Sequence, residues 1–342
     1  MYEHTSKLIE LDDPFADIAL QIVPADQYIP IEGKINILFT MFEMLDVPES
    51  YKVNLAKADY VIVPCRHNKD LFRPYTKRAP YVCGEGIEAG EYQYHERKYP
   101  NFASGERFRI YWAGAPNPRK GYHYALELIK HIQNDPRVEI YIKTTFPKVE
   151  PSAAIEGAKK MIEAGYNMPR LKDIADGKDK QVYEQYMKAG TLQVHGKHKN
   201  ILFDTRRVSS EELVELYHKA HVFIFPSMGE GWGLMGNEAL ATGLPMVAPM
   251  ITGIRDWYSP KYGEVCRTII EDIKSENYNF TARSYMPEPK DFIEKTLSLL
   301  DRNNYAKALA KAKIGSKHIH EFHTWDKKAK RLFDIIQEIG HL

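Results

Sequence analysis

Residues 225–245 read FPSMGEGWGLMGNEALATGLP, and this stretch decides the fold. It continues an apolar, strand-sized run that begins at Val222 and ends at Pro226. A glycine-rich turn follows, and the spacing of apolar residues predicts a helix from about Leu234. The first N–H groups of a helix lack partners within the helix, and the helix dipole is positive at that end. The stretch therefore predicts a turn that can hold an anion such as a diphosphate.

Two carboxylates lie on this predicted turn and helix. Glu230 precedes the helix, and Glu238 lies just over one turn inside it. Glycines at 229, 231 and 233 would let the backbone approach a ligand closely, because glycine has no Cβ. The two carboxylates could then reach different hydroxyls of one extended ligand. The alternative is a glycine-rich loop with two solvated glutamates.

The rest of the chain alternates strands and helices. In the first hundred residues we predict strands at 35–40 and 60–64 around a helix at 48–58. A second series has predicted strands at 108–112, 138–143, 201–203 and 221–225, and helices at 122–132 and 209–220. Strands that alternate with helices favour parallel sheets with crossover helices, so the predicted class is α/β.

The length of 342 residues is too great for one ordinary core and predicts two domains. We expect an acceptor-side domain at 1–104, which ends in a linker at about 94–106, and a donor-binding domain at 105–320. A charged segment at about 147–190 is predicted to be an insertion in the second domain. Residues 321–342 are predicted to form a C-terminal helix that packs back toward the first domain.

The turn and its surroundings resemble a known enzyme family. Glu230, seven intervening residues and Glu238, followed by EALATGLP, resemble the donor signature of the family-4 retaining glycosyltransferases. Residues 322–326, FHTWD, resemble the aromatic element before the last helix of that family. The resemblance covers roughly residues 105–340. It implies a GT-B fold, in which two Rossmann-like domains face each other across a cleft, here with an abbreviated N-terminal domain.

The resemblance also implies roles for single residues of the turn. Glu230 would bind hydroxyls of the donor sugar and counts as catalytic, and Glu238 would hold the ribose hydroxyls. The backbone of four consecutive residues would offer N–H groups to the sugar and the phosphates: Gly231, Trp232, Gly233 and Leu234. A carboxylate that accepts hydrogen bonds from two neighbouring hydroxyls makes strong charge-assisted contacts, so these roles are chemically reasonable.

A second motif runs from Gly114 to Gly121. Here the family carries a Gly-Arg pair and a Lys-Gly pair whose two cations face the diphosphate. Lys120 is present and is expected to be catalytic, because a fixed cation stabilises the charge of the departing diphosphate. Ala115 stands where the family has arginine, and Arg119 is the candidate substitute; an ordinary solvated lysine at position 120 is the alternative. Gly114 and Arg119 join the predicted donor-binding set.

The first domain gives a weaker signal. Glu43 follows the strand at 35–40, near where the family places polar groups that face the acceptor. A buried or solvated carboxylate without a role in binding is the alternative interpretation. The resemblance implies no bound cofactor or metal: the nucleoside-diphosphate sugar is a substrate, and the cation and the helix end would do the work of a metal.

Composition limits the partners. No apolar run approaches the ~20 residues that cross a bilayer, and the three cysteines are too few and too widely spaced for a disulfide framework, so a cytoplasmic protein is expected. Residues 1–100 hold 11 Lys and Arg against 16 Asp and Glu, while the rest holds 36 against 30. An acidic first domain argues mildly against a polynucleotide acceptor, because phosphate binding requires a basic face. A glycan, lipid, protein or small-molecule acceptor stays open.

Several functions remain compatible with the sequence. The favoured one is retaining transfer of a sugar from a nucleoside-diphosphate sugar to an acceptor hydroxyl, with the leaving phosphate helping to take the proton. A catalytically weak subunit that only binds nucleotide sugars would show affinity without turnover. A nucleotide-sugar epimerase would change the sugar without an acceptor. A glycosyltransferase acting on modified nucleic acid is less expected, given the acidic first domain.

Overall fold

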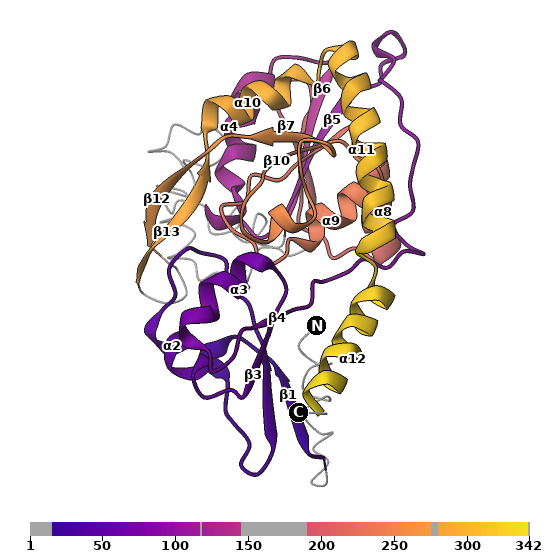
Figure 1. Ribbon diagram of the computed structural model, residues 1–342. Helices are drawn as coiled ribbons and strands as arrows, with labels where there is room; N and C mark the ends of the chain where they lie inside the picture. Colours follow the sequence, from indigo (N-terminus) through magenta and orange to yellow (C-terminus); the bar gives the residue numbers. More distant parts are fainter. Residues whose placement is uncertain (1–15, 117, 145–189, 275–279, 341–342) are drawn as a thin grey trace.

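The computed structural model describes residues 16–340 except 117, 145–189 and 275–279. Two lobes, each built on a parallel sheet, lie one above the other (Figure 1). All but the last residue of the predicted insertion at 147–190 lies outside the described residues. No helix of the described part of the chain is long and apolar enough to cross a membrane.

The first lobe contains a four-stranded sheet with the order β1-β2-β3-β4, in which every neighbouring pair is parallel. Its strands are β1 (Ile18–Ile22), β2 (Ile35–Phe39), β3 (Tyr60–Val63) and β4 (Tyr81–Val82). Two short helices, α2 (Glu49–Leu55) and α3 (Arg66–Phe72), connect them. All four residues of β3 are buried, as expected for an apolar run in a parallel sheet covered on both faces.

The second lobe contains a seven-stranded sheet with the order β11-β10-β9-β5-β6-β8-β7. Only β7 runs antiparallel to its neighbour. The strands are β5 (Phe108–Ala113), β6 (Val138–Lys143), β7 (Leu192–His195), β8 (Ile201–Asp204), β9 (Val222–Ile224), β10 (Met246–Pro249) and β11 (Glu264–Cys266). After β5 the chain adds β6, β7 and β8 on one side of β5, and then adds β9, β10 and β11 on the other side. The strand order therefore reverses between β5 and β9.

Helices flank this second sheet. They are α4 (Tyr122–Ile132), α8 (Ser210–Lys219), α9 (Leu234–Ala241), α10 (Pro289–Ser298) and α11 (Arg302–Phe322). Short 3₁₀ turns occur at Ala25–Gln27, Arg73–Tyr75, Phe102–Ser104, Pro118–Lys120 and Thr252–Asp256. Ser209 caps α8 in a reciprocal capping box with Glu212, which satisfies two backbone donors at that helix end. The helix predicted at 122–132 is observed with the same bounds.

The last helix, α12 (Trp325–Gly340), leaves the second lobe and packs on the first sheet (Figure 1). Ile335 and Ile339 are buried there against Ile37 and Ile62. Where the chain crosses back, the N–H of Ile87 donates to the carbonyl of His323 at 2.9 Å. Two crossings of the chain, outward near residue 87 and back near residue 324, therefore lie side by side between the lobes.

A hairpin also joins the lobes. Strands β12 (Thr268–Lys274) and β13 (Thr281–Pro287) pair antiparallel and extend from the second lobe beside the first (Figure 1). Ala282 is buried in the core of the first lobe. The guanidinium of Arg283 donates to both carboxylate oxygens of Asp46, at 2.7 Å and 3.0 Å. The hairpin therefore adds hydrogen bonds and apolar contacts to the contact between lobes.

Candidate active site

Two strand-to-helix turns meet at the point where the strand order reverses. One leads from β5 through residues 114–121 to α4, and the other leads from β9 through residues 225–233 to α9. Because β5 and β9 are neighbours and parallel, their carboxyl ends lie at the same edge of the sheet. In open α/β sheets ligands bind in the crevice at this reversal point. Topology alone thus brings together the two motifs that the sequence separates by about a hundred residues.

The two turns are in direct contact. The N–H of Met228 donates to the carbonyl of Arg119 at 2.8 Å. Gly121 has a φ of +70°, and a Cβ at this position would lie 2.1 Å from the carbonyl oxygen of Pro226. A side chain at position 121 would therefore suffer both an unfavourable backbone conformation and a steric clash. Glycine at this place lets the first turn close on the second.

Glu230 is the centre of the charged cluster. Both its carboxylate oxygens accept hydrogen bonds from the Lys120 ammonium at 2.8 Å, and Ser227 donates to one of them at 2.7 Å. A guanidinium nitrogen of Arg119 lies 3.7 Å from the same carboxylate. Burial by itself would raise the pKa of Glu230, but the two cations and the hydrogen bonds outweigh it and hold the pKa below 4.5. Glu230 is therefore a buried, ionised carboxylate.

Arg119 takes a place in this cluster although Ala115 lacks the arginine of the family motif. Its guanidinium donates to the carbonyl of Gly229 at 2.8 Å and lies 3.4 Å from the Glu43 carboxylate. Arg119 and Lys120 therefore present two adjacent cations at the turn. Ala115 is exposed, and Arg119, four places later in the sequence, is an arginine that contacts the Glu230 carboxylate.

Helix α9 begins at this cluster. Its N-cap, Gly233, has a φ of +96°, and its carbonyl accepts from the N–H of Gly236 at 3.1 Å. The N–H groups of Leu234 and Met235 belong to the first turn of the helix, where no carbonyl of the same helix can serve as acceptor. The positive end of the helix dipole and the N–H groups of Leu234 and Met235 therefore lie at the same edge of the sheet as Lys120.

Glu238 lies further along α9 and has partners of its own. The hydroxyl of Tyr217 donates to its Oε2 at 3.0 Å, and Tyr92 also donates to this carboxylate. Burial raises the pKa of Glu238 to about 7, and the two tyrosine hydrogen bonds reduce this shift only in part. The structure places Glu238 on the same helix as predicted, but it is not among the groups that bind Glu230.

The first lobe covers two of the three glycines of the turn. A Cβ at Gly229 would lie 2.1 Å from the backbone oxygen of Glu43, and one at Gly231 would lie 2.1 Å from the Met41 sulfur. The sequence suggested that these glycines make room for a ligand. In this structure the space beside them is taken by the loop after β2, so they permit close contact between the lobes.

Trp232 serves this contact as well. A Cβ on Gly84 of the first lobe would lie 2.6 Å from the Trp232 ring. The centroid of this ring is 5.4 Å from the Lys328 ammonium on α12. The backbone carbonyl of Trp232 accepts from the indole N–H of Trp257 at 2.8 Å. The predicted donor-binding residue thus packs its side chain between the first lobe and the last helix.

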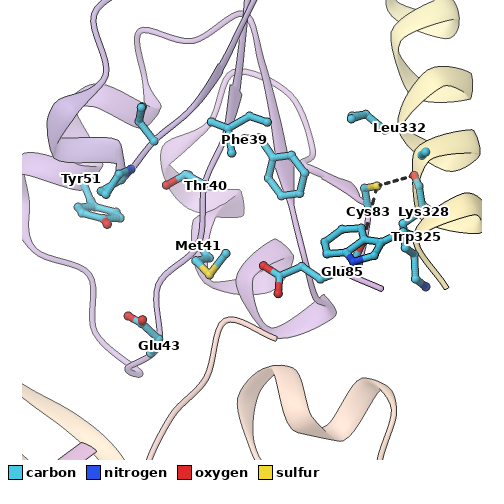
Figure 2. Close-up of a pocket in the computed structure, with 15 residues that line it drawn as sticks. Phe39, Thr40, Met41, Glu43, Tyr51, Cys83, Glu85, Trp325, Lys328 and Leu332 are labelled. Carbon is cyan, nitrogen blue, oxygen red and sulfur yellow. Dashed lines mark hydrogen bonds between the residues drawn. The ribbon is translucent and has the colours of Figure 1, made fainter. Parts of the chain in front are cut away.

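A pocket of about 680 Å³ opens in the first lobe beside this turn (Figure 2). The residues that follow β1, β2 and β4 line it, and α12 closes one side. Met41 and Glu43 belong both to this lining and to the contacts with the glycine-rich turn. The volume is within the range of small-molecule sites. The pocket therefore borders the Lys120–Glu230 cluster.

Glu85 is a functional candidate that sequence analysis did not single out. It follows β4, lines the pocket, and points into it (Figure 2). Burial, with a further contribution from the negative charge of Glu230, raises the pKa of Glu85 to about 7, while Lys120 opposes this shift. No strand was predicted directly before Glu85, so the sequence did not show that this side chain lies beyond the carboxyl end of β4, where ligand-binding side chains gather in parallel sheets.

Ser227 and Thr252 were also missed. Ser227 donates to Glu230, and the hydroxyl of Thr252 accepts from the backbone N–H of Glu230 at 2.9 Å. The carbonyl of Glu230 in turn accepts from Gly253 at 3.0 Å. These bonds fix both the side chain and the backbone of Glu230. Only the Ser227 contact, three residues away, is local enough for the sequence to suggest it.

The sequence of the second lobe matches a known family. Residues 175–332 match the family described as "Family 4 Glycosyltransferase in conflict systems". This match covers just under half of the chain, and it includes Glu230 and Glu238, the two residues that carry the resemblance to the donor signature. Comparison with curated proteins by sequence finds no match.

Solved structures share the fold. Sucrose-phosphate synthase from Thermosynechococcus elongatus superposes with a TM-score of 0.64 at 15% identity, over 99% of this chain and 77% of the other. HepE from Anabaena, in complex with UDP-glucose, gives 0.60 at 12% identity, over 89% and 72%. The pneumococcal O-GlcNAc transferase GtfA gives 0.52 at 16%, over 91% and 53%. The predicted GT-B arrangement of two Rossmann-like domains is confirmed.

Proposed function

We propose that this protein is a glycosyltransferase that retains the anomeric configuration and moves a sugar from a nucleoside-diphosphate sugar to the hydroxyl of an acceptor held by the first lobe. One observation carries the proposal. At the reversal point of the sheet, Lys120, Arg119 and the first turn of α9 converge beside a buried carboxylate, Glu230. Two cations and a helix N-terminus are groups that bind a diphosphate.

The proposed roles follow from the contacts. The diphosphate lies against the N–H groups of Leu234 and Met235, with Lys120 and Arg119 beside it. Glu230 binds hydroxyls of the donor sugar and keeps Lys120 in position through the two 2.8 Å bonds. Glu238 holds the ribose hydroxyls with the carboxylate lone pairs that do not accept hydrogen bonds from Tyr217 and Tyr92.

The chemistry needs no nucleophile from the protein. The acceptor oxygen forms a bond to the anomeric carbon on the face from which the diphosphate leaves. The bond from that carbon to the phosphate oxygen breaks, and its electron pair goes to the nucleoside diphosphate. The acceptor proton passes to the leaving phosphate. Lys120 and the N-terminus of α9 stabilise the negative charge that grows on the phosphate, which lowers the barrier directly.

A screen of donors by thermal shift tests this proposal. HepE was solved with UDP-glucose and GtfA with UDP and GlcNAc, so UDP-glucose and UDP-GlcNAc come first, followed by GDP-mannose and ADP-glucose. A ligand that binds only the folded protein raises its melting temperature. We expect at least one donor to do so, with much weaker responses from Lys120→Ala and Glu238→Ala. If no nucleotide sugar raises the melting temperature, the proposed donor site is wrong.

A further inference from the structure

The pocket beside the donor turn is walled mainly by carbon. Its lining includes Phe39, Met41, Trp325 and Leu332, together with the residues after β1. Figure 2 shows the Phe39 and Trp325 rings on the side nearest α12, with Met41 on the side of the glycine-rich turn. Trp325 is 45% exposed, so its ring is open to a ligand. The lining therefore suits a ligand with an apolar or aromatic surface.

Few polar groups interrupt this lining. Thr40 is 3% exposed, and its hydroxyl has no hydrogen-bond partner among the described residues. A buried hydroxyl without a partner costs free energy, so an unfilled acceptor or donor position here points to a ligand. Glu85 points into the same pocket, whereas Glu43 is already engaged by Arg119.

Lys328 does not add a free cation to the pocket. Its ammonium lies 3.1 Å from a ring nitrogen of His323 and over the ring of Trp232. Its backbone carbonyl accepts from the Cys83 thiol. Glu85 and Thr40 are thus the polar groups of the lining best placed to bind an acceptor.

A sugar ring fits such a pocket poorly. Each of its hydroxyls would leave water and would need a partner in the protein, because an unpaired buried hydroxyl weakens binding. An alcohol with an apolar or aromatic body needs only one or two such partners. Its carbon surface would replace water against Phe39, Met41 and Trp325, which is favourable.

We propose that this pocket is the acceptor subsite and that it selects an alcohol whose reacting hydroxyl is attached to an apolar or aromatic body, with Glu85 accepting a hydrogen bond from that hydroxyl and Thr40 bonding a second polar atom. The inference rests on the proposed function, since it names the acceptor of the same reaction. The bonds that form and break are those of the transfer described above. Glu85 orients the acceptor oxygen, and the proton still leaves with the phosphate.

A competition between acceptors tests the inference. The enzyme is given the donor that raises its melting temperature, together with benzyl alcohol, methyl α-D-glucopyranoside, or a single-stranded oligonucleotide containing 5-hydroxymethylcytosine. We expect the highest kcat/KM with benzyl alcohol. Preference for the methyl glucoside or the oligonucleotide, with donor binding intact, would overturn the acceptor class and leave the proposed function standing. Absence of donor binding would instead contradict the proposed function.

Two matched pairs of variants locate the subsite. Ala329→Trp fills the pocket from α12, whereas Lys330→Trp places the same ring at the next, exposed position outside the lining. We expect the first to lower kcat/KM for benzyl alcohol at least tenfold with the donor-induced rise in melting temperature retained, and the second to change neither. Equal effects of the two, or no effect of Ala329→Trp, would overturn the location.

A second matched pair of variants tests the role of Glu85. At a pH above the Glu85 pKa of about 7, Glu85→Gln keeps the size of the side chain but removes its charge, and a hydrogen bond to a charged group contributes about 1.5–3 kcal/mol, which is roughly 10- to 150-fold in kcat/KM. Glu88→Gln, three residues on and exposed, is the control. A change in kcat/KM of less than threefold for Glu85→Gln would show that another group orients the acceptor.

Discussion

The proposed donor side and the proposed acceptor side surround their carboxylates in different ways. On the donor side, charges pair with one another: Glu230 has Lys120, Arg119 and Ser227 as partners, and its pKa lies below 4.5. On the acceptor side, a mainly apolar pocket holds Glu85, whose pKa burial raises to about 7. In the proposed reaction the charged diphosphate would bind at the paired cluster, and the acceptor would be selected by the shape of the pocket and a few polar groups.

The largest effect is expected from breaking the donor cluster. Lys120→Met removes the cation that bonds both oxygens of Glu230 and that is proposed to face the leaving phosphate. Loss of one preorganised group that stabilises transition-state charge lowers kcat by about 10²–10³-fold. Steady-state kinetics with a responding donor measures this loss, and thermal unfolding checks that the variant is folded. Lys130→Met on the surface of α4 is the control, and equal activity of the two variants would contradict the role of Lys120.

The next largest effect on activity is expected from pushing the two lobes apart at the glycine-rich turn. Gly229→Ala would place a Cβ 2.1 Å from the backbone oxygen of Glu43, so the lobes cannot approach as they do here. A displacement of about 1 Å between reacting groups can cost on the order of 10²-fold in rate. We expect transfer to fall at least tenfold. Gly90→Ala, whose Cβ would meet only the Glu88 side chain at 3.8 Å, should retain activity. Retention by both variants would show that this contact is dispensable.

The opposite pKa shifts predict opposite pH dependences of stability. The raised pKa of Glu85 means that its protonated form stabilises the fold: this contribution is complete below about 4.5 and is lost as pH rises through about 7. Glu85→Gln should therefore lose less stability than the wild type between pH 5 and 8. The depressed pKa of Glu230 contributes stability above 4.5 that is lost as pH falls below it, so Glu230→Gln should be most destabilised at neutral pH.

Denaturant unfolding of the wild type and both variants across pH 3.5–8.5 measures this difference. Glu238 shares the raised pKa of about 7, so Glu85→Gln should reduce the slope above pH 5 without abolishing it. Parallel curves for all three proteins would mean that the two carboxylates do not differ in the way the structure implies.

The smallest effect is expected at the surface contact between the lobes. Asp46→Asn removes the charge that pairs with Arg283 of the hairpin, and the side chains of Arg283 and Asp46 are 59% and 36% exposed. Exposed pairs contribute little and are screened by salt. We expect a slight fall in melting temperature at low ionic strength that disappears in high salt. A fall that persists in high salt would show that the hydrogen bonds of this pair, rather than its charges, join the lobes.

The sequence singled out the turn around Glu230 far more clearly than the pocket of the first lobe, for a physical reason. The Glu230 turn is a contiguous stretch whose glycines and helix start are local features, and the helix predicted at about 122–132 is observed there. The acceptor pocket joins the ends of β1, β2 and β4 to α12, which lies some 240 residues away from β4. Glu85 and Thr40 carry no motif, so only the folded chain shows that they face one space.

The sequence also could not assign the glycines of the turn correctly. Gly229 and Gly231 have the spacing of a ligand-binding loop, yet their neighbours in this structure are Glu43 and Met41 of the other lobe. Close approach to a ligand and close approach to another backbone both require glycine, so the residue type alone does not separate them. Arg119 is a similar case, because its distance from Glu230 depends on contact between two turns.

The most direct test is a crystal structure of the wild-type enzyme with the nucleotide sugar that raises its melting temperature. We expect the diphosphate within hydrogen-bond distance of the Lys120 ammonium and the N–H of Leu234, with the sugar beside Glu230. A diphosphate bound away from the first turn of α9, with Lys120 still paired only to Glu230, would contradict this expectation.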